Sequence, residues 1–84
     1  MNDKLKQAIN ELQFHIDKDW EEVLLIFDTQ HDLEQYKKMR MEDMKRGFIP
    51  ETYFDKIELI SLEDLLNNNS LTGRRFCQYF FMSN

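Results

Sequence analysis

The single cysteine, Cys77, is the feature that most limits how this 84-residue chain can fold. One thiol cannot form an intramolecular disulfide, and it cannot supply a multi-thiolate metal site. An apolar core must therefore hold the fold together, and 42% of the residues are apolar and 13% aromatic. Because a chain of this length has room for one core, we expect a single domain over residues 1–84.

Apolar residues at helical spacing indicate the first two expected helices. In the first, four apolar residues follow one another at intervals of four, three and four positions: Leu5, Ile9, Leu12 and Ile16. The second is expected over residues 20–27, because Glu21 and Glu22 would meet the positive end of its helix dipole.

Capping signals bound the third expected helix. Thr29 and Asp32 have the spacing of a capping box, in which a side-chain oxygen accepts from a free backbone N–H of the first turn. Gly47 is a natural stop, since glycine adopts the left-handed conformation that ends helices. We therefore expect a helix over residues 30–46.

Two further short helices complete the expected fold. Ser61 and Asp64 repeat the capping spacing before a leucine-rich turn, and Ser70 or Thr72 would cap a last helix that carries the C-terminal aromatic residues. We therefore expect an all-α fold, a small bundle of about five mostly short helices.

Two segments leave an alternative open. Residues 23–27 form a continuous apolar run, which is also typical of a buried strand, and residues 56–60 alternate between polar and apolar as a strand does. If both segments are strands, the fold is α+β.

The charge is unevenly distributed along the chain. The net charge of -5 argues against a general affinity for nucleic acid, because a polyanion repels an acidic surface. Residues 1–34 hold nine acidic residues against three basic ones, whereas residues 35–56 hold six basic residues against four acidic ones. This polarity could guide a partner or let two copies pair as a homodimer, and ordinary solvated helix faces also produce it.

Reactive residues are scattered. Cys77 lies in an aromatic stretch and is expected to pack as a small hydrophobic residue. His15 and His31 share no motif, and acidic neighbours such as Glu21 and Glu22 point about 100° apart on a helix. We therefore expect no catalytic site, no metal and no cofactor.

Two basic stretches are candidates for partner binding. Residues 37–46 combine bases with three methionines, whose flexible side chains suit an adaptable protein-binding surface. Residues 71–76 place two arginines before an aromatic cluster, where their guanidinium groups could hydrogen-bond to a carboxylate or a phosphate. The candidate residues are Lys37, Arg40, Met41, Lys45, Arg46, Phe48, Arg74 and Arg75.

These observations favour a small non-enzymatic regulator that binds another protein, as an inhibitor or adaptor does. The general character of the chain resembles small acidic phage proteins that disable or redirect a host factor, which implies a host protein as partner but no residue roles. The alternative is a nucleic-acid-binding regulator that uses the basic third helix with Arg74 and Arg75.

We expect a cytoplasmic protein without membrane insertion. No secretory signal is visible in residues 1–6, and the longest apolar run, residues 23–27, is far shorter than the roughly 20 residues that cross a bilayer.

Overall fold

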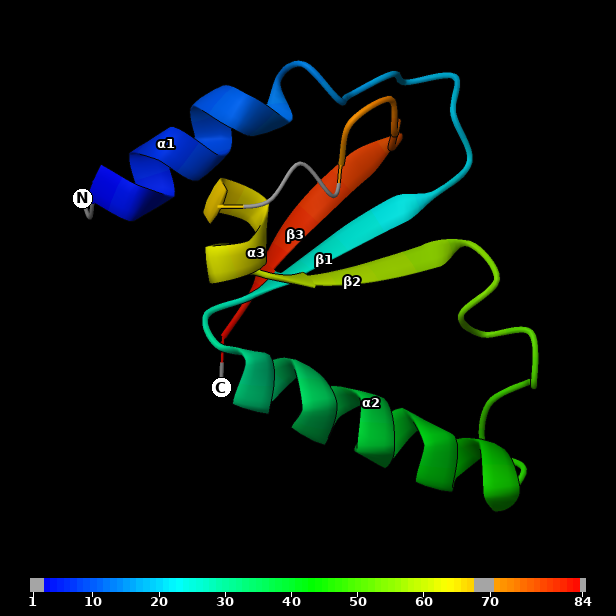
Figure 1. Cartoon of the computed structure of the whole chain (residues 1–84). Helices are drawn as coiled ribbons and strands as arrows, with labels where there is room; N and C mark the ends of the chain where they lie inside the picture. The colour runs from blue at the N-terminus through cyan, green and yellow to red at the C-terminus, as the bar shows by residue number, and fades with distance from the viewer. Residues whose placement is uncertain (1–2, 68–70, 84) are drawn as a thin grey trace.

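The computed structural model describes residues 3–67 and 71–83, and within them it has three helices around a three-stranded parallel sheet (Figure 1). The strand order is β2-β1-β3, so β1 is the central strand. Along the chain the elements are α1 (Asp3–Leu12), β1 (Val23–Phe27), α2 (Gln30–Lys45), β2 (Ile57–Ser61), α3 (Leu62–Asn67) and β3 (Gln78–Met82).

The all-α expectation is therefore wrong, and residues 20–27 show why. Residues 23–27 of this expected helix form β1, in which Leu24 and Ile26 pack on one face of the sheet and Leu25 and Phe27 on the other. A central parallel strand is buried on both faces, which makes it a continuous apolar run without alternation. Both segments of the α+β alternative are strands, with β2 one residue later than 56–60.

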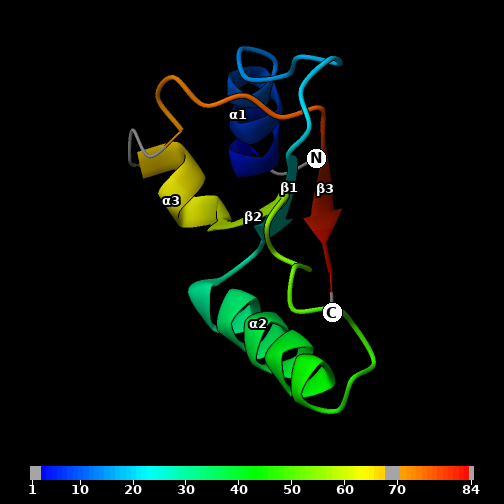
Figure 2. The same cartoon turned by 90° about the vertical axis from the view of Figure 1, so that its right-hand side faces the viewer.

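The helices cover the two faces of the sheet. α2 packs below it in Figure 1, where Leu33 joins Leu25 and Phe27 in one apolar cluster. α1 and α3 lie on the opposite face, as both views show (Figures 1 and 2), and there Leu12 and Leu65 pack with Phe76 in a second cluster. The sheet is therefore the middle layer of three.

The expectation of a last helix is also wrong, because residues 78–82 form the strand β3. Its aromatic residues have high strand propensity, and successive side chains of the strand point to opposite faces: Tyr79 packs toward α1 and α3, and Met82 toward α2. Ser70, one of the two expected caps, lies outside the described residues. The first helix ends at Leu12, and Ile16 instead makes a parallel bridge with Phe76.

The helix boundaries that depend on local contacts are confirmed. The Thr29 hydroxyl accepts the N–H of Asp32 at 3.1 Å before α2, and the Ser61 hydroxyl accepts the N–H of Asp64 at 3.2 Å before α3. Gly47 has φ +77° just after α2, which lets the next residues bond back to the last turn.

Candidate functional site

The exposed side of α2 gathers three of the candidate residues into one surface. Lys37, Met41 and Lys45 lie four residues apart, so they form one stripe, and Lys38 lies beside it. These four side chains, together with Glu34 and Glu42, line a shallow hollow of about 430 Å³. We call the surface formed by Lys37, Lys38, Met41 and Lys45 the lysine face.

The lysine face carries free charge around an apolar side chain. Within the described part of the chain, the ammonium groups of Lys37, Lys38 and Lys45 make no ion pair or hydrogen bond. Met41 between them is 48% exposed. A surface of this kind can attract carboxylates while an apolar group of the partner covers Met41.

Three other candidates on or after α2 lie outside the lysine face. Arg40 bonds to Asp43 at 2.9 Å and stacks over the ring of Tyr36 at 5.5 Å, so its charge is held on the sheet side of the helix. Arg46 contacts Glu42 at 3.8 Å. Phe48, which is 72% exposed, follows the end of the helix.

Arg74 is occupied inside the molecule. Its guanidinium donates to Glu22 and to Glu58, each at 3.1 Å, and it stacks over Phe76 at 5.5 Å. The hydrogen bond to Glu58, with a lesser contribution from Glu22, raises the pKa of Arg74 further above its ordinary value, and burial opposes this effect. This arginine therefore ties the segment before β3 to the segment before β1 and to β2.

Arg75 is held more loosely. It contacts Asp17 at 3.6 Å and stacks over Trp20 at 5.5 Å. The loop that carries both arginines lies above the sheet in Figure 1, whereas α2 lies below it. The two basic stretches that the sequence singled out are thus not brought together into one surface.

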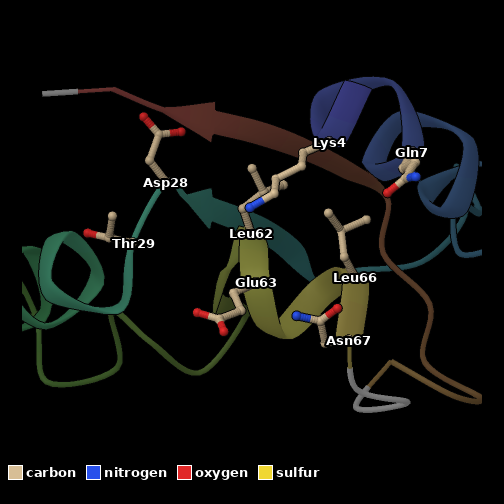
Figure 3. Close-up of a pocket in the computed structure, with 8 residues that line it drawn as sticks. All are labelled: Lys4, Gln7, Asp28, Thr29, Leu62, Glu63, Leu66 and Asn67. Carbon is tan, nitrogen blue, oxygen red and sulfur yellow. The ribbon is translucent and has the colours of Figure 1, made fainter. Parts of the chain in front are cut away.

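Sequence reasoning missed a hollow of about 620 Å³ at the carboxyl ends of β1 and β2 (Figure 3). The loop after β1 leads to α2 on one face of the sheet, and the chain after β2 leads to α3 on the other. Such a crevice is where open parallel sheets usually bind ligands. It is lined by Lys4, Gln7, Asp28, Thr29, Leu62, Glu63, Leu66 and Asn67. The polar pair Asp28-Thr29 directly after an apolar run is the sequence signal for this hollow, and it indicates a crevice only if that run is a strand.

The chemistry that this hollow offers is polar binding. Asp28 and Glu63 are solvent-exposed, whereas carboxyls that transfer protons in enzymes are usually held in apolar surroundings. The Thr29 hydroxyl already caps α2. The described lining residues therefore offer polar contacts to a small molecule.

The histidines and the cysteine lie apart from the hollow. The Nδ1 atom of His15 lies 3.0 Å from the carbonyl oxygen of Arg74, His31 is exposed in the first turn of α2, and Cys77 is half-buried just before β3. Among residues 3–67 and 71–83 no group of three or more His, Cys, Asp or Glu side chains could hold a metal ion. Over the same residues, no helix is both long and apolar enough to span a membrane.

Comparison with known proteins identifies no relative: no family model, no curated protein and no solved structure matches this chain.

Proposed function

We propose that this protein is a non-enzymatic regulator that binds another protein through the lysine face of α2. The observation that carries the proposal is a set of three ammonium groups without an ion pair among the described residues, which share one hollow with the exposed side chain of Met41 and with Glu34 and Glu42. An acidic chain with a net charge of -5 concentrates free positive charge there, while both arginines of the loop before β3 contact the protein's own carboxylates.

The partner that fits this surface presents an acidic segment with an apolar anchor. Its carboxylates would meet Lys37, Lys38 and Lys45, and its anchor would cover Met41. Phe48, exposed after the end of α2, can extend the apolar contact. Charged contacts of this type mainly accelerate association and select the partner, whereas the buried apolar contact supplies most of the affinity. A reducing cytoplasm suits the free thiol of Cys77.

Charge reversal tests the proposal directly. The double variant Lys37→Glu/Lys45→Glu should lose the protein partners that the wild type captures from its host cell, identified by mass spectrometry. The matched control is Lys6→Glu/Lys18→Glu, which changes the net charge equally at two exposed positions outside α2. We expect at least tenfold weaker binding for the first variant, which corresponds to about 1.4 kcal/mol, and no more than a small loss for the control.

The nucleic-acid alternative predicts a different kind of binding, which depends strongly on salt. Phosphate contacts release counterions, so binding to duplex DNA or RNA would fall steeply between low and moderate salt. Retention of protein partners by the Lys37→Glu/Lys45→Glu variant would refute the proposed surface. Salt-sensitive binding to nucleic acid without any protein partner would refute the proposed function.

A further inference from the structure

Among the residues that the structure describes, none pairs with most of the outer edge of β3. β3 lies at the border of the sheet (Figure 2), and it exposes two large aromatic side chains, Phe80 at 48% and Phe81 at 38%. The two point to opposite faces, because successive residues of a strand do so. α2 leans toward β1 and β2, which leaves Phe80 uncovered on its face.

The hydrogen bonds around β3 identify which backbone groups are free. The N–H of Cys77 bonds to the carbonyl of Glu22, on the β1 side, whereas the N–H of Phe76 bonds to the carbonyl of His15 on the outer side, both at 2.8 Å. Backbone groups alternate between the two edges of a strand, so those of Gln78, Phe80 and Met82 face outward. Within the described residues, no chain segment pairs with them.

The edge of β3 carries no charged side chain that would hinder pairing with another strand. Natural edge strands are commonly guarded by charged side chains, and the other edge strand, β2, carries Glu58 and follows directly after Lys56. By contrast, residues 76–84 contain no charged side chain, although 32% of all residues are charged. Two copies that each carry a net charge of -5 can therefore approach along β3 without opposing carboxylates on the strands.

We propose that β3 pairs with β3 of a second copy, antiparallel about a twofold axis at Phe80, to form a continuous six-stranded sheet. In this register Phe80 faces Phe80 and Gln78 faces Met82. In an antiparallel ladder, such hydrogen-bonded pairs exchange both N–H···O bonds. The three outward N–H groups and three outward C=O groups of each copy are then all paired, which no other twofold register achieves.

The side chains fit the same register. Tyr79 of one copy lies opposite Phe81 of the other, on the face of α1 and α3, and the two Phe80 rings meet on the face of α2. Aromatic cross-strand pairs of this kind stabilise sheets. A five-residue strand pair is small against a standard interface of about 800 Å² per partner, so we expect a dissociation constant between roughly 1 μM and 1 mM.

Sedimentation across a concentration series up to about 1 mM, the upper limit of the expected dissociation constant, tests the dimer. The wild type should pass from monomer to dimer, and Phe80→Lys should stay monomeric because it places two ammonium groups face to face. Phe14→Lys is the matched control: Phe14 is 77% exposed in the turn after α1, so the composition changes identically without touching β3. A wild type that stays monomeric, or a dimer that Phe80→Lys leaves intact, overturns the proposal.

Cysteine cross-linking tests the register independently. In a chain with Cys77→Ser, the variant Phe80→Cys should form a disulfide-linked dimer on oxidation, because the Cα atoms of a hydrogen-bonded pair lie about 5.5 Å apart. Gln78→Cys should not, since four residues along the strand separate the two thiols by about 14 Å. Preferential cross-linking at position 78 would overturn the register. Both tests leave the lysine face unchanged, so this proposal can fail without the proposed function.

Discussion

Replacement of Arg74 by methionine is expected to lower the free energy of unfolding by about 1–2 kcal/mol. The variant loses two charged hydrogen bonds of 3.1 Å, to Glu22 and Glu58, and keeps an aliphatic side chain over Phe76. Because the Arg74 side chain is 37% exposed, each bond is limited to the range of about 0.2–1 kcal/mol that partly solvated pairs contribute. The loss of both bonds also leaves the carboxylates of Glu22 and Glu58 without their shared partner, so we expect the total loss in the upper half of the summed range for two bonds.

Urea unfolding followed by circular dichroism measures the loss. With a denaturant dependence of about 1 kcal/mol per M, the midpoint should fall by about 1–2 M for Arg74→Met. The control is Arg75→Met, one position along the chain, where the side chain is 60% exposed and its carboxylate contact is 3.6 Å long; its loss should stay within about 0.5 kcal/mol. High salt should narrow the difference between the two variants. Equal losses, or no loss for Arg74→Met, would refute an internal role for Arg74.

Three further predictions concern the fold around the site. Thr29→Ala should cost about 1 kcal/mol in urea unfolding, because it removes the hydroxyl that caps α2, and Thr29→Ser should restore most of it. Ile26→Ala should cost about 2–5 kcal/mol by leaving a cavity at a 1% exposed position of the central strand, whereas Ile9→Ala, at a 37% exposed position, should cost less than about 1 kcal/mol. Burial and a 2.9 Å hydrogen bond to Tyr53 raise the pKa of Tyr36 to about 12 from an ordinary 10.0, so the folded protein keeps a proton that the unfolded chain releases. Stability should therefore be fully present below pH 10 and fall from about pH 10 to pH 12, less steeply in Tyr36→Phe, as stepped-pH unfolding would show.

Local contacts explain which elements the sequence could predict. The cap at Thr29 and the stop at Gly47 involve residues three to five positions apart, so their signals are complete in a short window. β3 depends instead on pairing with β1, where Gln78 lies beside Val23, 55 positions earlier in the chain. No window around residues 78–82 contains that partner. The aromatic spacing of these residues therefore predicts a helix, whereas they form the strand β3.

The difference between local and long-range contacts also decides which parts of the candidate site could be predicted. The lysine face could be predicted because residues 37–45 belong to one helix, and helical spacing alone places Lys37, Met41 and Lys45 together. The internal bonds of Arg74 could not be predicted, because its partners Glu22 and Glu58 are 52 and 16 positions away, on segments that meet only in the folded sheet. An arginine in a loop has the same local appearance whether it contacts a partner or its own chain.

The two proposed surfaces, taken together, predict bivalent binding. A twofold axis perpendicular to the sheet at Phe80 keeps both copies of α2 on the same face, so a dimer would present two lysine faces to one side. Linked sites of this kind raise the apparent affinity for a multivalent surface by about 10²–10⁴-fold without any new contact.

Immobilised partner at high density would reveal this effect. The variant Phe80→Ser should then dissociate much faster than the wild type, while its affinity for a single partner molecule in solution stays unchanged. The control Phe14→Ser should behave as the wild type does in both assays. Equal dissociation of all three proteins from the dense surface would show that the lysine faces act one at a time. A matching loss of affinity in solution would instead place Phe80 in the partner-binding surface itself.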